Sequence, residues 1–355
     1  MIGETAVSVA FLKVGIVRFM HILVLGGTQF VGRHMVEKAL KRGHTLTLFN
    51  RGNQAGLFDV EERIGDRQGD LASLASGQWD AVIDVSGYVP RHVRLSAELL
   101  KNRCGIYCFI STVSVYEALL APWQDRAITE DATLLELAEP TEDVKGDTYG
   151  ALKVLCEKVV TEVFPNSHLI LRPGVVVGPY DHTDRFSYWV HRVAGGGEML
   201  TPGKEDTPIQ YVDARDLASW TLACLEAKTT GIYNTVVPPE TYSMKDLFEA
   251  TEKVTNSSPS YTWVDEPFLT QQGVGPPELP MWPPEAYKNF VQVSSDAAVT
   301  NGFKVRSLKD TVKATYDYLQ SLDEAYELKA GLKPEREKEL LSLWQKETPP
   351  RGEAG

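Results

Sequence analysis

The amino-acid sequence predicts an α/β fold in which a doubly wound parallel sheet is combined with a smaller C-terminal lobe. Short apolar runs alternate with amphipathic stretches through the first half of the chain, whereas proline and tryptophan become frequent after residue 173. The chain has 355 residues, of which 43 % are hydrophobic and 24 % are charged. A length well above the roughly 150 residues of one domain allows two lobes, each with its own core.

Five apolar runs have the length of buried parallel strands and are apolar enough to be covered on both faces. Between them, residues 31–42, 91–102 and 149–163 show the helical spacing of apolar side chains. Strands that alternate with helices in this way join one sheet through right-handed crossovers. The predicted strands are 21–25, 45–49, 80–84, 106–110 and 168–172.

Residues 1–19 precede the first predicted strand and do not resemble a membrane anchor. Their apolar stretch is interrupted by Lys13 and Arg18, and it falls short of the roughly 20 apolar residues that a membrane span needs. No A-x-A-like cleavage site follows, which disfavours a signal peptide. We expect Met20 to be the natural start and residues 1–19 to be a loosely attached extension.

The remaining organisation follows from composition. The stretch 267–284 holds six prolines together with Met281 and Trp282, too broken for a helix, and we expect it to cover a ligand. Residues 308–329 again show a helical pattern, and the charged end of the chain is expected to fray. The predicted units are a sheet lobe at 20–175 with later returns at about 207–236, a smaller lobe at 176–206 and 237–330, and a charged tail at 331–355.

Charge and cysteine content restrict the function classes. The net charge of −12 repels phosphate backbones, so nucleic acid is an unlikely partner on these grounds. The four cysteines form no C-x-x-C pair, and we expect them to be buried thiols of a reducing, cytoplasmic compartment. The seven histidines lack metal-ligand spacing, so we predict no metal site.

The strand at 21–25 runs directly into the glycine loop Gly26-Gly27-Thr28-Gln29-Phe30-Val31-Gly32, and a helix pattern follows at once. Small residues at such a turn let backbone N–H groups approach a pyrophosphate at the positive end of the helix. Gln29 occupies the position where the middle glycine of this motif usually lies. The alternative is an ordinary tight turn. The loop residues predicted to bind a cofactor are Gly26, Thr28, Gln29, Phe30, Val31 and Gly32.

The second predicted strand ends in Asn50-Arg51 where an acidic residue would bind both ribose hydroxyls. Without that carboxylate a 2′-phosphate is not repelled, and Arg51 and Arg33 could attract it, which favours NADP over NAD. Arg51 could equally be a solvated surface residue. Asp66 follows the expected third strand and is available to an adenine amino group, or it is a turn residue. Ser86 and Lys153 complete the predicted cofactor-binding set.

Tyr149 is the one tyrosine of fourteen that is followed four positions later by a lysine, Lys153. This spacing places both side chains on one face of the helix predicted at 149–163. A nearby ammonium favours the phenolate and lowers the pKa of a tyrosine from about 10. Such a phenol can exchange a proton with a substrate hydroxyl or carbonyl.

Hydroxyl side chains follow the strand predicted at 106–110, in the run Ser111-Thr112-Val113-Ser114-Val115-Tyr116. Open α/β sheets bind ligands at the carboxyl ends of their strands, so these hydroxyls are candidates for substrate contact. The alternative is a hydroxyl that only caps the strand end.

Together these residues resemble the short-chain dehydrogenase/reductase superfamily, in its extended branch of NAD(P)-dependent epimerases and dehydratases with a Rossmann-type sheet. The similarity spans about residues 20–325. G-G-T-Q-F-V-G-R and F-N-R-G resemble most closely an atypical subgroup that includes plastid stem-loop RNA-binding relatives. The motifs that carry the resemblance are G-G-T-Q-F-V-G at 26–32, F-N-R-G at 49–52, S-T-V-S-V-Y at 111–116, Y-G-A-L-K at 149–153, L-R-P-G-V-V-V-G-P at 171–179 and Y-V-D-A-R-D-L-A at 211–218.

The resemblance implies roles for three residues. Tyr149 is the catalytic acid/base, Lys153 lowers its pKa and holds the nicotinamide ribose, and Thr112 polarises the substrate. Departures from the family pattern weaken two substrate classes. Val113-Ser114 replaces the Asp-Glu pair of 4,6-dehydratases, and the Asn and Arg that nucleotide-sugar epimerases carry near Val175 and Ile209 are absent.

Further polar side chains are candidates for substrate binding: Tyr88, Ser114, Arg185 and Gln210. Asp181 and Asp184 are expected to line the same cleft, although Asp184 and Arg185 could instead form a surface ion pair.

The predicted function is that of an NAD(P)-dependent oxidoreductase or epimerase acting on a secondary alcohol or ketone, including a sugar or nucleotide-sugar. The alternatives are a non-catalytic RNA-binding protein and a cofactor-sensing regulator that docks a protein through an apolar patch at Met281 and Trp282. We also expect a homodimer. The helix at 149–163 carries apolar residues on more than one face, which fits either a dimer or burial within the monomer; they are Leu152, Val154, Leu155, Val159 and Val160.

Overall fold

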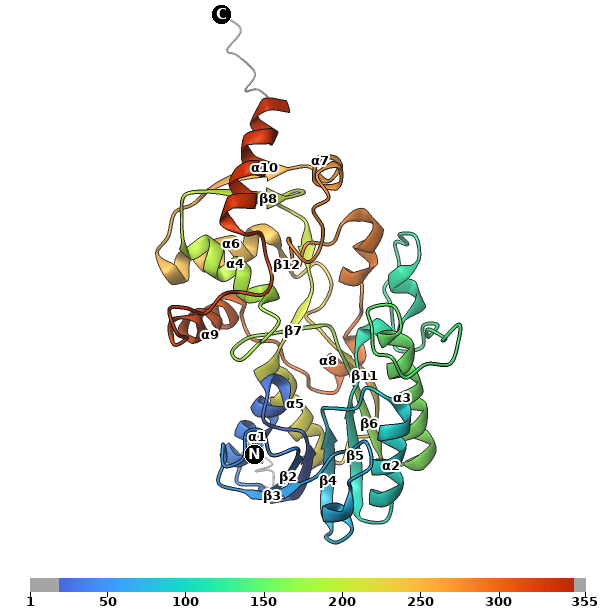
Figure 1. Cartoon of the computed structure of the whole chain (residues 1–355). Helices are drawn as coiled ribbons and strands as arrows, with labels where there is room; N and C mark the ends of the chain where they lie inside the picture. Colours follow the sequence, from blue (N-terminus) through green and yellow to red (C-terminus); the bar gives the residue numbers. More distant parts are fainter. Residues whose placement is uncertain (1–18, 348–355) are drawn as a thin grey trace, which may run out of the picture.

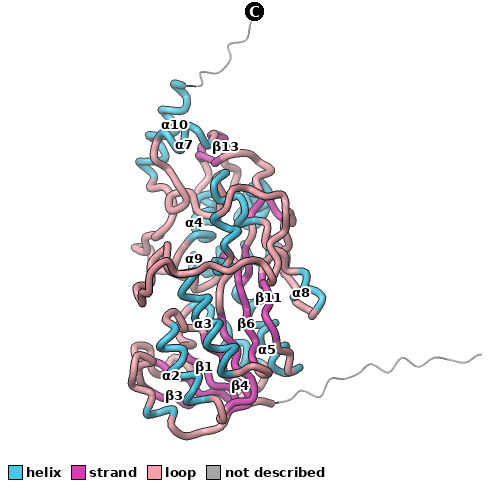
Figure 2. Tube along the Cα trace, turned by 90° about the vertical axis from the view of Figure 1, so that its right-hand side faces the viewer, coloured by secondary structure: helices cyan, strands magenta, loops and turns pink. Residues whose placement is uncertain are grey.

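The computed structural model describes residues 19–347 as two lobes stacked along one axis (Figure 1). The sheet lobe forms one end, and the smaller lobe lies above it with its last helix farthest from the sheet (Figure 2). The predicted extension at 1–19 falls outside the described residues except for Phe19.

The sheet lobe is built on seven parallel strands in the order β11-β6-β5-β4-β1-β2-β3. At its centre Ile22 pairs with Leu46 on one side and with Ala81 on the other. All five predicted strands form, and β3 ends just before Gly65. The strands are β1 His21–Leu25, β2 Thr45–Asn50, β3 Glu61–Ile64, β4 Trp79–Asp84, β5 Cys104–Ile110, β6 His168–Pro173 and β11 Gly231–Thr235.

Helices cover both faces of this sheet, which confirms the doubly wound α/β fold (Figure 1). Helices α1 (Phe30–Lys41) and α5 (Ala214–Ala227) lie on one face, against Ile22 and Val24. Helices α2 (Pro90–Leu100) and α3 (Tyr149–Val163) lie on the other, against Leu23 and Leu25. Because successive side chains of a strand point to opposite faces, both faces of β1 are buried. Cys108, Cys156 and Cys224 are buried free thiols, as predicted, and Cys104 is half-buried.

The smaller lobe packs helices around three short strand pairs, and its largest buried side chain is Trp189. Strand β7 pairs with β10, β9 with β12, and β8 with β13. Helix α8 (Asp296–Thr300) packs beside β11 at the base of this lobe. The other elements are β7 Val175–Val177, α4 Arg185–Ala194, β8 Glu198–Pro202, β9 Pro208–Ile209, β10 Tyr211–Asp213, β12 Tyr242–Ser243, α6 Met244–Thr255, β13 Ser260–Val264, α7 Glu266–Gln271, α9 Leu308–Gln320 and α10 Pro334–Glu347.

The prediction that the charged tail frays is wrong for α10 at 334–347. Leu340 and Leu341 form an apolar side of this helix and are buried against the smaller lobe. The Glu337 carboxylate accepts a hydrogen bond from Leu200 N at 3.0 Å and pairs with Arg192 at 2.8 Å. Apolar burial together with this ion pair fixes a helix whose overall composition is polar.

Two boundaries also differ from prediction. The proline-rich stretch begins in the short helix α7, because a proline is tolerated in the first turn of a helix and Asp265 caps it by accepting from Phe268 N. The helix predicted to continue to residue 329 ends at Gln320.

The apolar residues of α3 are explained by burial within the monomer. Leu152, Val154, Val159 and Val160 are all buried in the sheet lobe, and Leu155 is half-buried. The observation that motivated a homodimer is therefore accounted for by the monomer's own packing, and the dimer stays a prediction.

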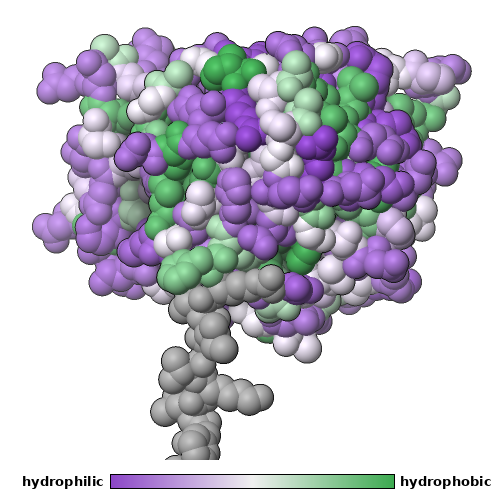
Figure 3. Space-filling view, turned by 90° about the horizontal axis from the view of Figure 1, so that it is seen from below, coloured by the Kyte–Doolittle hydropathy of each residue, from purple (hydrophilic) through white to green (hydrophobic). Residues whose placement is uncertain are grey.

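Seen from the sheet end, the surface is mostly hydrophilic, with hydrophobic residues interspersed (Figure 3). No helix among residues 19–347 is long and apolar enough to cross a membrane.

Candidate active site

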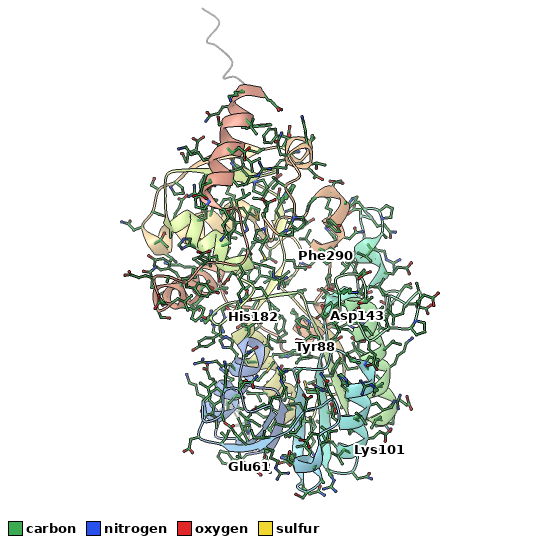
Figure 4. The ribbon with its side chains drawn as sticks, in the orientation of Figure 1. Glu61, Tyr88, Lys101, Asp143, His182 and Phe290 are labelled. Atoms are coloured by element: carbon green, nitrogen blue, oxygen red, sulfur yellow. The ribbon has the colours of Figure 1, made fainter. Side chains whose placement is uncertain are left out.

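One cavity of about 1520 Å³ lies between the two lobes, at the carboxyl ends of the sheet strands. Figure 4 shows Tyr88, His182 and Phe290 placed around this space, from the sheet lobe and from the smaller lobe. Of the residues singled out in the sequence, Arg33, Asp181 and Asp184 do not line it. Those that line it include Gly26, Thr28, Gln29, Phe30, Val31, Gly32, Asn50, Arg51, Asp66, Ser86, Tyr88, Thr112, Ser114, Tyr149, Lys153, Arg185 and Gln210.

The glycine loop forms one end of the cavity, and only glycine fits at three of its positions. Gly26 and Gly27 have φ angles of +106° and +98°, which side chains rarely adopt. A Cβ at Gly32 would lie 2.8 Å from the backbone of Gly27, so the loop and the start of α1 approach too closely for any side chain. The first turn of α1 carries no acidic residue. Its positive end is therefore available to an anion.

The cavity is cationic although the protein is acidic. Among its described lining residues are three arginines and one lysine, Arg51, Arg67, Arg185 and Lys153, whereas Asp66 is the one lining carboxylate. A concave surface with excess positive charge attracts anionic ligands. The net charge of −12 therefore does not describe the field inside the cavity.

Asn50 and Arg51 lie where β2 ends. The Asn50 side-chain oxygen accepts from Gly52 N at 2.7 Å, and its buried Nδ2 has no hydrogen-bond partner among the described residues. An unpaired buried donor is unfavourable unless a ligand satisfies it. Arg51 is exposed at the cavity mouth. Asp66 caps a turn by accepting from Gln68 N at 2.9 Å, and it also lines the cavity, so its contact with an adenine amino group stays a prediction.

Arg33 does not take the position expected for it. Its Nε lies 2.8 Å from Glu37 Oε1, and its guanidinium stacks 3.7 Å from the centre of the Tyr180 ring. The i, i+4 spacing and the aromatic face hold it outside the cavity lining. The expectation that Arg33 attracts a 2′-phosphate is therefore wrong, and Arg51 alone remains for that role.

Arg67 is a cavity residue that the sequence analysis missed. It forms a two-pronged ion pair with the buried Asp84, at 2.6 and 2.8 Å, and its NH1 donates to Ser86 Oγ at 3.0 Å. Burial by itself would raise the pKa of Asp84, but the charge of Arg67 and the hydrogen bonds from Arg67 and Tyr107 together outweigh burial, and the pKa is lowered. Ser86 is thereby fixed in the cavity wall. The available signal was the acidic end of strand 80–84, which needs a cation once buried.

Tyr149 begins α3 and faces the cavity together with Tyr88, at 6.4 Å between ring centroids. Burial raises the pKa of Tyr149 to about 12, the neighbouring Tyr88 adds to this, and the Thr112 hydroxyl and the Arg185 charge oppose it. The expected lowering of this pKa by Lys153 is not found. Tyr149 is a neutral phenol around pH 7, the form that donates a proton.

Lys153 is almost fully buried, and two backbone carbonyls explain its orientation. Its Nζ donates to Gly87 O and to Ile110 O, both at 2.7 Å. Burial lowers the pKa of Lys153 to about 8. An ammonium has three N–H donors, so one remains after these two bonds.

The hydroxyls after β5 separate into two groups. Thr112 Oγ1 donates to Ser114 Oγ at 3.2 Å and accepts from Ser114 N at 3.1 Å, and both side chains line the cavity. Ser111 also borders the cavity, but its hydroxyl donates to the buried Glu157 carboxylate at 2.5 Å. The Thr112 hydroxyl is near enough to Tyr149 to lower the pKa of that phenol through a hydrogen bond.

A buried polar network supports this wall. Arg172 on β6 pairs with Glu157 on α3 through Nε–Oε1 at 3.0 Å and NH2–Oε2 at 2.7 Å. Arg172 also donates to the Tyr116 hydroxyl, which in turn donates to Asn234 Oδ1 on β11 at 2.7 Å. The network joins two strands, the loop that carries Thr112, and the helix that carries Tyr149.

Three expected substrate residues have structural partners instead. Gln210 donates to Val237 O and Val293 O and accepts from Val293 N, so its amide is fully used although it borders the cavity. Asp181 and Asp184 do not line the cavity. Asp184 accepts from the Tyr326 hydroxyl and from Lys329 N rather than pairing with Arg185, so both expectations for it are wrong.

The wall facing the sheet comes from residues 276–291 of the smaller lobe, which we call the roof segment. Met281 and Trp282 belong to it and face the cavity, and Trp282 is 5 % exposed. They do not form the exposed docking patch that the regulator hypothesis requires. The proline-rich stretch covers the cavity, as its composition suggested; its lining residues are Pro276, Pro277, Pro280, Met281, Trp282, Pro283, Pro284, Tyr287, Phe290 and Val291.

A seven-stranded parallel sheet with a glycine loop under a ligand-sized cavity defines a Rossmann-type α/β protein. The chain belongs to the NAD dependent epimerase/dehydratase family, whose sequence profile matches residues 22–236. This confirms the family expected from the sequence motifs.

Relatives of known structure share the fold. UDP-glucuronic acid 4-epimerase from Bacillus cereus, in complex with NAD, aligns with a TM-score of 0.62 and 19 % identity, covering 85 % of this chain and 99 % of its own. The enzyme WbmH from Bordetella bronchiseptica, in complex with NAD+, aligns with a TM-score of 0.61 and 16 % identity, covering 86 % and 99 %. At such identities the likeness concerns the fold alone.

A curated relative agrees with the subgroup expected from the sequence. The chloroplast stem-loop binding protein of 41 kDa b from Arabidopsis thaliana is 25 % identical over 221 residues, which cover 56 % of this chain and 53 % of the relative. The chain thus spans about half the length of that protein.

Proposed function

We propose that the protein is an NAD(P)-dependent oxidoreductase or epimerase that acts on a secondary alcohol or ketone. The observation that carries this proposal is the placement of Thr112, Tyr149 and Lys153 on one wall of a cavity whose end is the glycine loop. A proton-exchanging phenol beside a dinucleotide cradle is the arrangement that hydride chemistry at a carbinol carbon requires.

The cavity suits a dinucleotide on several independent grounds. The loop around Gly27 and Gly32 leaves backbone N–H groups uncovered at the start of α1. The orphaned Nδ2 of Asn50 and the exposed guanidinium of Arg51 provide donors beyond the loop. When bound, NAD(P) would supply the hydride acceptor or donor at its nicotinamide ring.

The chain's own residues handle the proton and the positioning. As a neutral phenol, Tyr149 donates its proton to a ketone oxygen in reduction and becomes a phenolate. In oxidation the phenolate form takes the hydroxyl proton and returns to the phenol. Thr112 places a hydroxyl against the same oxygen. The remaining N–H of Lys153 is available to a ribose hydroxyl, while its other two bonds hold the side chain in place.

We further propose a preference for NADP over NAD. The cavity wall carries Arg51 at the end of β2 and no carboxylate there, since Asp66 is its one described lining carboxylate. A 2′-phosphate is therefore attracted rather than repelled. Arg33 contributes nothing to this preference because Glu37 and Tyr180 hold it elsewhere.

Calorimetric titration of the purified protein with NADP and NAD, followed by absorbance near 340 nm with a panel of alcohols and ketones, tests the proposal. We expect saturable binding of both cofactors, tighter for NADP, and a hydride-transfer signal with at least one compound. Absence of cofactor binding would overturn the proposal. Tighter binding of NAD would overturn the NADP preference alone.

The pH dependence of cofactor binding follows from Lys153. Its pKa of about 8 means that the third N–H is present below that pH and lost above it. We expect the dissociation constant for NADP to rise as the pH passes through about 8 and to be flat below it. The Lys153→Met variant should bind more weakly throughout and show no such inflection; an inflection that persists in this variant contradicts the assignment.

The name of the Arabidopsis relative favours one second candidate, RNA binding. The net charge of −12 counts against it, because RNA affinity comes mainly from cations that meet phosphates. Filter binding of a stem-loop RNA over a range of salt concentrations separates the two. Salt-sensitive binding in the micromolar range or tighter would favour the RNA function.

A further inference from the structure

The roof segment has an unusual chemistry for a wall that contacts a ligand. None of its ten lining residues is charged, and five of them are prolines. A proline has no backbone N–H, so half of these positions cannot donate a main-chain hydrogen bond. The roof therefore offers mainly C–H and aromatic surface, from Met281, Tyr287 and Phe290 among others.

Contacts at both ends of the roof segment hold it in place. Trp189 Nε1 donates to Pro280 O at 2.5 Å, and Gly331 N donates to Pro277 O at 3.1 Å. At its other end the Asn289 amide donates to Ala118 O and Ala121 O, at 2.8 and 2.9 Å, which ties the segment to the sheet lobe. The apolar wall is thus preformed, as ligand pockets usually are.

Arg185, the first residue of α4, supplies positive charge to the same cavity. Its Nε donates to Thr183 Oγ1 at 3.1 Å, and no carboxylate oxygen of residues 19–347 lies within 4.0 Å of its guanidinium. Thr183 donates to one oxygen of the nearby Asp181 carboxylate through both its N–H and its hydroxyl, and Asp181 acts on Arg185 through its charge without a direct contact. Arg185 is close enough to Tyr149 to lower the pKa of that phenol.

The other cations of the cavity either have bonding partners or lie at the end of β2. Arg67 is paired with Asp84, and Lys153 is bound to two carbonyl oxygens beside Tyr149. Arg51 lies at the end of β2, next to Asn50. Arg185 is therefore the permanent cation beside Tyr149 that has no ion-pair partner within 4.0 Å among residues 19–347, and a single guanidinium matches one anionic group better than the two phosphoryl groups of a pyrophosphate.

We infer that the substrate is a small molecule that carries one anionic group on an apolar, preferably aromatic, body. Its single carboxylate or phosphomonoester binds Arg185, and its body packs against the roof segment, which brings a neighbouring carbinol or ketone oxygen to Tyr149. The inference rests on the proposed function and specifies its substrate class. It sets the protein apart from an enzyme that binds a nucleoside-diphosphate sugar in this half of the cavity.

Equilibrium binding to the protein saturated with oxidised NADP tests the inference without turnover. The probes are phenylpyruvate, its neutral methyl ester, benzyl phosphate and UDP-glucose. We expect phenylpyruvate or benzyl phosphate to bind at least tenfold more tightly than both the ester and UDP-glucose, and the stronger of the two identifies the anion. Equal affinity for acid and ester, or tightest binding of UDP-glucose, would overturn the inference.

Variants of Arg185 locate the anion site. Arg185→Gln should weaken binding of the preferred anion about 10- to 100-fold and that of the ester less than about twofold, and Arg185→Lys should recover part of the loss. Arg94→Gln removes an exposed arginine on α2 and serves as the control for lost charge. An unchanged anion affinity in Arg185→Gln contradicts the assignment.

The same titrations separate this inference from the proposed function. If the unmodified protein does not bind NADP, the result counts against the proposed function itself. Normal NADP binding with a preference for UDP-glucose leaves the function in place and removes only the substrate class.

Discussion

Replacing Tyr149 with phenylalanine is expected to lower kcat by about 10²- to 10⁴-fold, the usual contribution of a general acid or base. The phenol lies on the cavity wall beside Thr112, and its raised pKa of about 12 keeps the transferable proton in place at neutral pH. The ring itself remains in the variant. The dissociation constant for the cofactor should therefore stay within about twofold, because no phenol oxygen is needed to hold it. Hydride transfer followed near 340 nm provides the measurement.

Tyr233→Phe is the matched control for this substitution. Tyr233 lies on β11 outside the cavity lining, and its hydroxyl donates to Thr230 O at 3.1 Å near the surface. We expect kcat for this variant to equal that of the unmodified protein. A Tyr149→Phe variant that retains kcat within about tenfold would show that the proton is transferred by another group.

The Arg172→Met variant is expected to lower the free energy of unfolding by about 3–5 kcal/mol, because it leaves the Glu157 carboxylate buried without its cation. Only 2 % of the Arg172 side chain and 4 % of the Glu157 side chain are exposed, and both prongs of the pair are within 3.0 Å. The Tyr116 hydroxyl also loses a donor. Such a loss is a large part of the 5–15 kcal/mol that stabilises a typical domain. Urea unfolding followed by circular dichroism measures it.

Arg94→Met removes an ion pair of the same geometry from the surface. Arg94 binds both carboxylate oxygens of Glu162, at 3.1 and 2.6 Å, but 42 % and 64 % of the two side chains are exposed. Exposed pairs are screened by water and contribute little, so its urea midpoint should match that of the unmodified protein. Equal destabilisation by both variants would show that burial is not what makes the Arg172–Glu157 pair important.

Much of the fold was predictable because its signals are local. A buried parallel strand needs a short apolar run, and each of the five predicted runs forms a strand of the sheet. The glycine loop was recognisable because Gly26 and Gly27 adopt positive φ angles that other residues disfavour. Helix α3 was found within its exact bounds from apolar spacing alone.

The predictions that failed concern partners distant in sequence. Helix α10 seemed too charged to pack, yet Glu337 reaches Arg192 and Leu200 of the smaller lobe. Gln210 seemed available to a substrate, yet its amide is bound to Val237 and Val293. Arg33 seemed available to a phosphate, yet it pairs with Glu37 on its own helix. Arg67, for which the sequence suggested no role, pairs with the buried Asp84.

The sequence by itself determined the sheet, its crossover helices and most of the residues that face one cavity, since hydrophobic period and turn chemistry act over a few residues. The tertiary structure alone decided which charges inside that cavity are paired and which segments form its walls. Which arginine remains unpaired, how Lys153 is oriented, and which wall the proline-rich stretch forms all depend on groups brought together from opposite ends of the chain. Burial and electrostatic interaction act through space, and they become defined only when the two lobes are packed.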